Sequence, residues 1–364
     1  MRIAFVYDAV YPYTKGGGEK RVYALSRELV SLGHEVHIFC LKFWKGEDTI
    51  SREGIFFHGV CPPYVFYAKS GRRSILGPVR FAAMLTPPLL KEKRFDVIDC
   101  QSFPYFPIFS CRIASQIKSS KLFVTWYEFW GDYWYRYVGW PLGFFGKIAE
   151  ALALSISPNI IAISEFTRRR LKKRNLHVVP SGVDYRQIKE IRPLKKKFDV
   201  MFVGRLIKEK NVDLLLRAVA SMSVRYPRIK CCIIGDGPEK PRILELVSSL
   251  GIKRNVEFRN FNTDEGMFSY LKSSRVLALP SSREGFGTIV IEANACGIPV
   301  VTVEAEDNAA KELIKNGING KVVKFSPEAL ATGIEQSFNT KVKPSKEYDW
   351  KEIAKKLEEV YLNA

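Results

Sequence analysis

The sequence predicts an α/β protein built from two Rossmann-like, doubly wound domains. The chain has 364 residues, of which 46% are hydrophobic, and this length suits two domains of roughly 100–200 residues each. Short apolar, β-rich segments alternate with segments of helical periodicity, a pattern typical of parallel sheets covered by helices on both faces. One polar, charged stretch at 183–197 interrupts the alternation, and we place the domain boundary there.

The first half of the chain, 1–184, forms the predicted N-terminal domain. After the opening strand, Val22, Leu25 and Leu29 fall on one face of a predicted helix over 19–33 that Gly33 can end. Apolar runs predict strands at 2–8, 34–41, 96–100, 121–127, 159–164 and 177–182.

The second predicted domain spans 197–346, with a linker at 185–196. Strands are predicted at 198–204, 230–237, 255–261, 275–282 and 299–304, and helices at 211–223, 241–251, 263–274 and 288–297. Ligands of open α/β sheets bind outside the carboxyl ends of the strands. We therefore expect the site in a cleft between the two domains.

Charge favours an anionic partner. The net charge is +19, and no acidic residue occurs between Glu53 and Glu92. Nucleotides, sugar phosphates, membrane phospholipid and nucleic acid all fit such a surface, and solubility or heat adaptation is the alternative explanation. We recognise no nucleic-acid-binding motif and expect no nucleic acid as a partner.

The sequence also favours a cytoplasmic location. No apolar run reaches the roughly 20 residues of a membrane-spanning helix, and the first residues lack a signal-peptide pattern. The seven scattered cysteines are expected to be buried free thiols in a reducing compartment.

Two glutamates flank a glycine-rich turn in "SSREGFGTIVIEANACG". Gly285 and Gly287 let the backbone approach a ligand at the start of the predicted helix, where unpaired N–H groups favour phosphate. Glu284 and Glu292 suit hydroxyl donors instead, such as a vicinal diol. The alternative is that Glu284 is a loop residue near a helix cap and that Glu292 pairs with a lysine.

Two cations occupy the loop "GRLIKEKN" between a strand and a helix. Arg205 and Lys210 there suit a diphosphate, although a solvated basic loop would look the same. A triple-glycine loop with Gly17 and Gly18 follows the first strand but lacks the spacing of a dinucleotide site or a P-loop. The turn "GDGP" at 235–238 is weak evidence by itself.

Along the chain, Gly204-Arg205…Lys210 is followed by "GDGP", then "NF", then "LPSSREGFG…E". Motifs in this order resemble the retaining, nucleotide-sugar-dependent glycosyltransferases of the GT-B fold, in the large family four (glycosyl transferases group 1). The resemblance covers almost the whole chain. "GGGEKRVYALSRELVSLGHEV" is similar to the family's first loop and helix, and "IIAISEFTRRRL…HVVPSGVD" to its interdomain crossing. "YDWKEIAKKLEEVY" is similar to its final helix, so 347–364 is expected to pack back on the first domain.

The resemblance implies roles for these residues. Arg205 and Lys210 would clamp the donor diphosphate, Glu284 would hold the donor sugar, and Glu292 would hold the ribose diol. The other implied donor-site residues are Gly17 and Gly18 over the phosphates, Phe261 and Asn262 at the base, and Gly285, Phe286, Gly287 and Thr288 around the sugar and phosphate.

The resemblance also implies a reaction on one face of the sugar, in which the departing phosphate takes the acceptor's proton. The chain has no Asp-x-Asp motif of the metal-dependent glycosyltransferase fold, so we expect no metal and no cofactor. Two departures stand out: Tyr127 replaces the histidine that the family often has there, which bears on sugar choice. "AEDNAAKELI" also replaces a common glycine pair.

The sequence says less about the acceptor than about the donor. Residues 126–147 hold four of the six tryptophans, which suits a glycan pocket or a membrane interface, unless most of these rings are core. With Arg72, Arg73 and Arg80 nearby, we expect a glycan or polyprenyl-lipid-linked acceptor, reached peripherally at the inner face of the cell membrane. The alternatives are a charge-driven anionic-lipid or nucleic-acid binding protein, or an epimerase or phosphorylase of the same fold.

Overall fold

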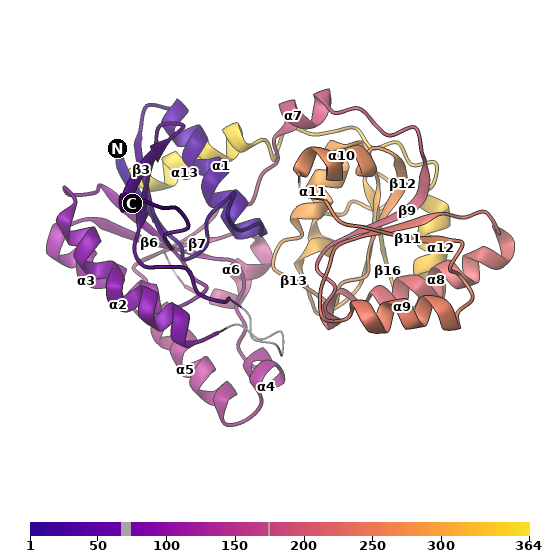
Figure 1. Cartoon of the computed structure of the whole chain (residues 1–364), viewed down its shortest axis with the longest axis horizontal. Helices are drawn as coiled ribbons and strands as arrows, with labels where there is room; N and C mark the ends of the chain where they lie inside the picture. Colours follow the sequence, from indigo (N-terminus) through magenta and orange to yellow (C-terminus); the bar gives the residue numbers. More distant parts are fainter. Residues whose placement is uncertain (67–73, 174, 262) are drawn as a thin grey trace. The chain divides into compact units, whose positions relative to one another are not determined.

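The computed structural model describes residues 1–66, 74–173, 175–261 and 263–364. It confirms the predicted α/β class, with a predominantly parallel sheet in each of two compact units (Figure 1). The first unit comprises 1–181 together with 350–364, and the second comprises 182–349.

The sheet of the first unit has the strand order β3-β4-β2-β1-β5-β6-β7-β8. Its strands are β1 (Arg2–Val6), β2 (Glu35–Cys40), β3 (Thr49–Arg52), β4 (Ile55–Gly59), β5 (Val97–Gln101), β6 (Lys121–Trp126), β7 (Asn159–Ala162) and β8 (Leu176–Val178). β3 pairs antiparallel with β4, and the other pairings are parallel. The strand order reverses direction between β1 and β5, so this is the switch point where loops diverge and ligands bind in such sheets.

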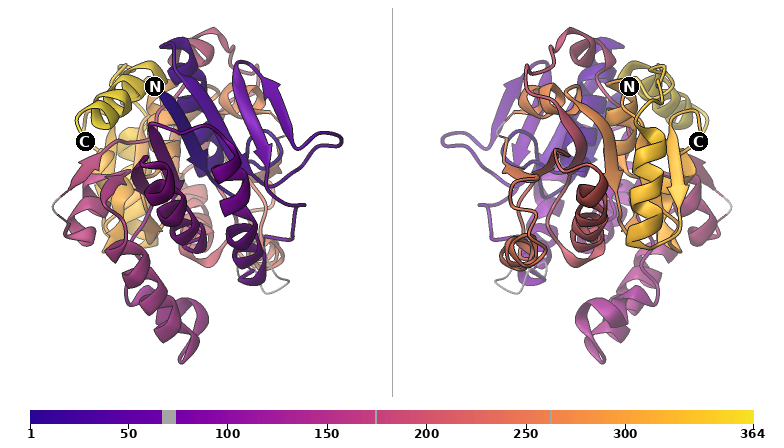
Figure 2. Two further views of the ribbon diagram at one scale, coloured as in Figure 1. Left: turned by 90° about the vertical axis from the view of Figure 1, so that its left-hand side faces the viewer. Right: turned by 90° about the vertical axis from the view of Figure 1, so that its right-hand side faces the viewer.

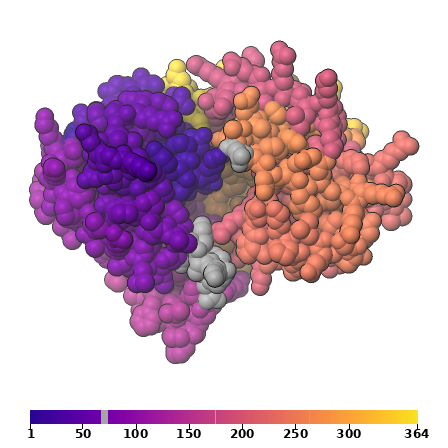
Figure 3. All heavy atoms as spheres, viewed as in Figure 1, coloured from indigo at the N-terminus to yellow at the C-terminus, as the bar shows by residue number. Residues whose placement is uncertain are grey.

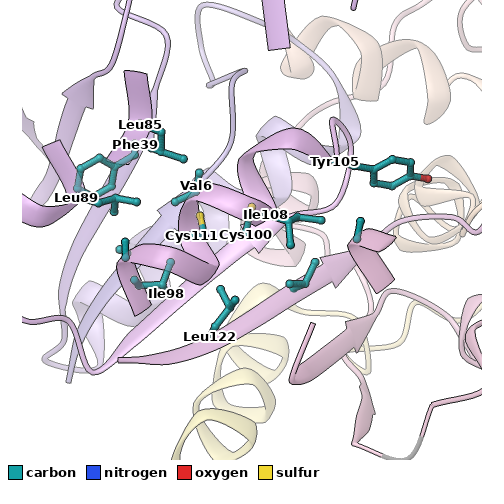
Figure 4. Close-up of a cluster of buried hydrophobic side chains, with 14 of the residues drawn as sticks. Val6, Phe39, Leu85, Leu89, Ile98, Cys100, Tyr105, Ile108, Cys111 and Leu122 are labelled. Carbon is teal, nitrogen blue, oxygen red and sulfur yellow. The ribbon is translucent and has the colours of Figure 1, made fainter. Parts of the chain in front are cut away.

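Helices cover both faces of this sheet. The first unit contains α1 (Gly17–Ser31), α2 (Leu76–Lys91), α3 (Phe106–Lys118), α4 (Tyr133–Val138), α5 (Leu142–Ser155), α6 (Glu165–Leu171) and α13 (Trp350–Leu362). Alternate residues of β1 serve two cores: Ile3 and Phe5 pack with α1 and α13, whereas Ala4 and Val6 pack with α2 and α3. Figure 4 shows part of the second core, in which Leu85 and Ile108 lie near Val6.

The last helix docks on the first unit, as predicted for the C-terminal segment. Tyr361 of α13 is fully buried, and its hydroxyl donates to Asp99 Oδ2 of β5 at 2.6 Å. On the same helix, Glu358 lies 2.6 Å from His34 Nε2. These contacts join residues that are more than 250 positions apart in sequence.

The second unit repeats the doubly wound plan. Its main sheet has the order β11-β10-β9-β12-β14-β16 and reverses between β9 and β12. The strands are β9 (Phe198–Val203), β10 (Cys231–Ile234), β11 (Val256–Arg259), β12 (Ser274–Leu279), β14 (Val300–Val303) and β16 (Gly320–Val323). The helices are α7 (Tyr185–Glu190), α8 (Val212–Arg225), α9 (Lys240–Ser249), α10 (Asp264–Leu271), α11 (Thr288–Ala295) and α12 (Pro327–Ser337). α8, α9 and α12 share one core with the sheet, and Figure 2 shows helices on each side of it.

The stretch that sequence analysis assigned to a linker, 185–196, lies within the second unit. It contains α7, whose Ile188 is fully buried. The backbone N–H of Leu194 donates to Ser273 Oγ at 2.6 Å, and Lys272 Nζ donates to the Ile191 carbonyl at 2.7 Å. The polar composition of this stretch reflects an exposed outer face on a segment that still packs.

A buried histidine pair joins β2 and β4. His37 Nδ1 lies 2.7 Å from His58 Nε2, the rings stack at 5.0 Å, and both residues are buried. Burial, together with the charge that His37 can carry, lowers the pKa of His58 to about 4. Burial also lowers the pKa of His37.

This pair predicts an acid-sensitive first unit. An unfolded histidine protonates near pH 6.5, whereas folded His58 protonates only near pH 4. The unfolded state therefore binds more protons between these values, and the free energy of unfolding falls as the pH drops through that window, by roughly 2–3 kcal/mol.

The measurement is urea unfolding at pH 7 and pH 4.5, followed by tryptophan fluorescence, because all six tryptophans lie in the first unit. His58→Gln removes one titrating group and should flatten the pH dependence. Equal losses for the wild type and His58→Gln would contradict the assignment.

Candidate functional site

Two loops meet at the switch point of the second sheet. The loop after β9 contains the 3-10 turn η1 (Lys208–Lys210) and then Asn211 in the left-handed region, with φ 47°. Asn211 Nδ2 donates to the carbonyls of Glu209 and Pro280, at 3.0 and 3.1 Å. The Ser282 N–H also donates to the Glu209 carbonyl, at 2.9 Å. These bonds tie the loop after β9 to the loop after β12.

Joining these loops brings Lys210 and Glu284 together. Lys210 Nζ lies 2.5 Å from Glu284 Oε1, and the two side chains are only 19% and 11% exposed. Arg205 is half-buried in the same loop, directly after Gly204. The sequence predicted these three residues in one site, and within this unit the structure shows that Glu284 pairs with a lysine.

Glu284 lies on a short strand instead of in an open loop. β13 (Arg283–Glu284) pairs in parallel with β15 (Asp307–Asn308). Asn308 is fully buried, and its Nδ2 donates to the Val303 carbonyl at 2.9 Å. The segment "AEDNAAKELI", which departs from the usual family pattern, therefore supplies the strand that positions Glu284.

The glycine-rich turn before α11 has a firm conformational requirement at Gly287. Its φ is 90°, and a Cβ there would lie 2.5 Å from Ala310 Cβ, so no other residue fits without movement. No side chain caps the start of α11, which leaves Thr288 at an uncapped helix N-terminus that favours anions. Phe286 is buried at the same turn.

Glu292 lies one turn further along α11. It is half-buried between Ile291 and Ala293, which are both buried. Thr288 and Ile289 are half-buried as well, so the face of α11 that carries Glu292 is partly open. A half-buried carboxylate on the same helix as the uncapped N-terminus can accept hydrogen bonds from a ligand.

The "GDGP" turn supports the Arg205 loop. The Leu206 N–H donates to the Asp236 carbonyl at 2.8 Å. A Cβ on Gly235 would lie 1.9 Å from the Gly204 carbonyl oxygen, and one on Gly237 would lie 2.3 Å from that of Leu206. These glycines permit the two loops to pack backbone to backbone, so their role is structural.

The loop after β11 contains the predicted base-binding residues. The ring of Phe261 is half-buried and packs against Tyr270, with 4.5 Å between ring centroids. Gly266 lies beneath it, because a Cβ there would be 3.1 Å from Phe261 Cδ1. Asn262 lies outside the described residues.

In the first unit, the glycine loop lies against two tyrosines. Gly17 begins α1 and is exposed, and a Cβ on Gly18 would lie 2.9 Å from Tyr7 Oη and 3.3 Å from Tyr127 Cζ. The rings of Tyr7 and Tyr127 stack with 6.3 Å between centroids. The loop after β1 and the end of β6 therefore converge at this edge of the sheet.

A buried polar network that sequence analysis missed holds Tyr127. The Tyr127 hydroxyl donates to Gln101 Oε1 at 2.7 Å, and Gln101 Nε2 donates to Asp99 Oδ1 at 3.0 Å. Thr125 and Tyr361 also donate to Asp99, at 2.8 and 2.6 Å. Burial raises the pKa of Tyr127, so at neutral pH it is a phenol whose proton is already engaged. The available signal was Asp99 itself, an acid within the apolar run "DVIDC".

The aromatic stretch 126–147 is partly core and partly surface. Trp126 is fully buried, whereas Trp140 is 79% exposed. In the sequence between these two tryptophans, the backbone N–H groups of Trp130 and Gly131 donate hydrogen bonds to the buried Glu150 carboxylate, at 2.8 and 2.7 Å. The alternative that most of these rings are core therefore holds for only part of the stretch.

Of the three basic residues predicted to approach a membrane, the structure describes one. Arg80 is exposed on α2, and Arg72 and Arg73 lie outside the described residues. In the part of the chain that the structure describes, no helix has the length and apolar character to cross a bilayer. Within the same residues, no His, Cys, Asp and Glu side chains are grouped to hold a metal ion.

Two family models together match most of the chain. The model described as Glycosyltransferase Family 4 matches residues 15–187, and the model described as Glycosyl transferases group 1 matches residues 184–360.

Among curated proteins, a D-inositol 3-phosphate glycosyltransferase of Corynebacterium urealyticum is 32% identical over 187 residues, which cover 46% of this chain and 43% of that protein. An uncharacterized glycosyltransferase of Methanocaldococcus jannaschii is 30% identical over 174 residues, 44% of each chain. The matched parts thus span less than half the length of these two relatives. One subunit of the Arabidopsis thaliana phosphatidylinositol N-acetylglucosaminyltransferase is 21% identical over 99% of this chain and 81% of that protein.

Solved glycosyltransferase structures share the fold. Sucrose-phosphate synthase from Thermosynechococcus elongatus aligns over 100% of this chain and 98% of its own, with a TM-score of 0.82 and 18% identity. HepE from Anabaena, solved with UDP-glucose, aligns over 100% of both chains, with a TM-score of 0.74 and 18% identity. These likenesses establish the GT-B architecture.

Proposed function

Because the chain belongs to the group 1 glycosyltransferases, we propose that it transfers a hexose from a nucleotide-diphosphate sugar, UDP- or GDP-linked, to a glycan or lipid-linked acceptor, with retention of configuration. The observation that carries this proposal is the Lys210–Glu284 pair at the switch point of the second sheet. A cation for phosphate and a carboxylate for sugar hydroxyls lie within one hydrogen bond of each other there.

The donor would bind along this edge of the sheet. Arg205 and Lys210 suit the two phosphates, and the uncapped start of α11 adds backbone amides for the same charge. Glu284 would then accept from the sugar, and Glu292 from the ribose diol. The UDP-glucose bound in the HepE structure supports a nucleotide sugar as the donor class.

Catalysis would consist mainly of positioning and charge stabilisation. As the glycosidic bond breaks, negative charge develops on the leaving diphosphate, and a preorganised cation stabilises that charge most effectively in a partly desolvated site. The leaving phosphate would take the proton of the attacking hydroxyl on the same face of the sugar. We propose that lysine and arginine supply the charge compensation, so that the reaction needs no metal.

The acceptor class draws support from two curated relatives. Their names specify D-inositol 3-phosphate and phosphatidylinositol as the molecules glycosylated, a soluble polyol phosphate and a membrane lipid. With its +19 charge, the chain suits an acceptor that carries phosphate, at an anionic membrane surface. We therefore propose a peripheral location for the reaction.

The test is calorimetric titration of the full chain with UDP, GDP and ADP, in near-physiological salt with EDTA. We expect one nucleotide to bind and Glu292→Gln to weaken it by roughly 10–100-fold, because a charged acceptor of the ribose hydroxyls is lost. Glu304→Gln, an exposed acid in the same unit, serves as the matched control. The proposal is wrong if no nucleotide binds, or if Glu292→Gln binds as tightly as the wild type.

A further inference from the structure

Helix α5 exposes large apolar side chains and buries its single acid, while its single base, Lys147, is exposed. Its exposed large side chains are Leu142 at 54%, Phe144 at 47%, Phe145 at 63%, Ile148 at 40% and Leu152 at 51%; we call these five residues the outer face of α5. On the opposite side of the helix, Glu150 is 1% exposed and Ala153 is fully buried. A helix on a water-facing surface normally has the reverse arrangement.

The inward side of α5 is fixed by specific packing. A Cβ on Gly143 would lie 2.8 Å from Tyr135 Cα of α4, and one on Gly146 would lie 2.4 Å from Trp134 Cε3. The Glu150 carboxylate accepts from Tyr105 Oη at 2.6 Å and from the backbone at the start of the α4 region. The helix cannot rotate to hide its outer face without losing these contacts.

The hairpin of α4 and α5 extends away from the sheet of its unit. Figure 1 and both views of Figure 2 show it projecting beyond the other helices of that unit, and Figure 3 shows magenta atoms at that end of the surface. Trp140, in the turn between the two helices, is 79% exposed. An exposed tryptophan at the tip of an apolar hairpin suits the interface between water and lipid.

The neighbouring helices continue the same character. On α2, Leu76 is 82% and Met84 is 41% exposed. On α3, Phe109, Ile113 and Ile117 are spaced four residues apart and are 37%, 51% and 62% exposed. α2 packs along α3, so the apolar side chains extend well beyond a single helix.

The charges on these helices are almost all positive. Across α2, α3, α4 and α5 the basic residues are Arg80, Lys91, Arg112, Lys118, Arg136 and Lys147. Glu150 is the single acid in the four helical ranges, and it is buried. Basic residues beside exposed apolar groups complement an anionic lipid surface.

We propose that the outer face of α5, with Trp140, inserts into the headgroup–acyl boundary of an anionic bilayer. α5 has 14 residues, or about 21 Å of helix, which is too short to span a core of about 30 Å. The helix therefore lies in the interface. The charge pattern selects a bilayer over a second copy of this chain, because two such positively charged surfaces would repel each other. This inference deepens the proposed lipid-linked acceptor and rests on it.

The experiment is flotation of the full-length protein with vesicles of phosphatidylcholine alone or with about one third phosphatidylglycerol. We expect binding to the anionic vesicles and at least a 10-fold weaker partition for Phe145→Ser/Ile148→Ser, because two apolar side chains that the bilayer would bury are lost. Val224→Ser/Leu244→Ser in the second unit, at positions 81% and 44% exposed, is the matched control and should bind like the wild type.

Two results would overturn the proposal. One is wild-type protein that binds neither kind of vesicle. The same holds if the protein binds both kinds of vesicle equally well and Phe145→Ser/Ile148→Ser does not weaken this binding. The other is a vesicle-free dimer, seen by sedimentation, that Phe145→Ser/Ile148→Ser converts to monomer, because the outer face would then belong to a second copy. Calorimetric measurement of nucleotide binding by the same variants separates this proposal from the proposed function. Their affinity for the nucleotide should equal that of the wild type, whether or not the hairpin binds lipid.

Discussion

Replacing Lys210 with methionine is expected to lower the rate of sugar transfer by about 10²–10³-fold, the loss typical of a single preorganised donor removed from a developing oxyanion. Lys210 Nζ is held 2.5 Å from Glu284, and its side chain is only 19% exposed, so its charge acts in a partly desolvated site where it is poorly screened. Methionine keeps much of the apolar stem but carries no charge, so the change isolates the ammonium group.

The measurement is release of nucleoside diphosphate from the donor identified by calorimetry, with kcat and KM determined separately. Lys208→Met is the control, because Lys208 lies in the same turn η1 but is exposed. A loss confined to KM would indicate that Lys210 contributes ground-state binding only. Equal effects of the two substitutions would contradict a specific role for Lys210, since general charge in the loop would then suffice.

Glu284→Gln changes the other member of the Lys210–Glu284 pair and helps to interpret the activity loss of Lys210→Met. Removing Lys210 leaves a carboxylate at 11% exposure without its cation, which destabilises the loop as well as the reaction. Thermal unfolding of both variants shows how much of the activity loss comes from the loop.

The alternation of apolar strands and amphipathic helices was enough to predict the doubly wound fold. Local patterning was less informative where tertiary packing decides the structure. α2 contains Pro87 and Pro88, which usually end a helix, and it continues because it packs along α3. The hairpin of β3 and β4 gave no clear signal, because β3 is four mostly exposed residues at the sheet edge.

The candidate site was predictable as separate motifs but not as an arrangement. Arg205, Lys210 and Glu284 each follow a predicted strand, and this placed them at one edge of a sheet. The contact between Lys210 and Glu284 spans 74 positions and depends on the strand order, with β12 beside β9. The pairing of β13 with β15 could not be predicted from the sequence either, because each strand is only two residues long.

The network around Asp99 was missed for a related reason. A strand that is buried on both faces has a continuous apolar sequence. A single acid within such a sequence can belong either to a ligand-binding site or to a structural hydrogen-bond network. Its partners Thr125 and Tyr361 lie on β6 and on the C-terminal helix, so the sequence around Asp99 does not reveal them. Burial raises the pKa of Asp99, and the positive charge of Arg21, fully buried on α1, partly opposes this rise.

Asp99→Ala is expected to lower the free energy of unfolding of the first unit by about 3–5 kcal/mol. The carboxylate accepts hydrogen bonds from Tyr361, Thr125 and Gln101, and its removal would leave these buried donors unsatisfied and Arg21 without its nearby opposite charge. Urea unfolding followed by tryptophan fluorescence measures this, because every tryptophan belongs to the first unit.

A double-mutant cycle with Tyr361→Phe then shows whether the C-terminal helix is held through Asp99. Tyr361→Phe alone should destabilise by about 1–3 kcal/mol, because one buried acceptor loses its donor. Added to Asp99→Ala, it should have little further effect, since both changes remove the same hydrogen bond. Tyr226→Phe, at a position 46% exposed in the second unit, is the control. Strictly additive effects of Asp99→Ala and Tyr361→Phe would mean that the helix docks through apolar packing of Ile353 and Leu357, independently of the network that orients Tyr127.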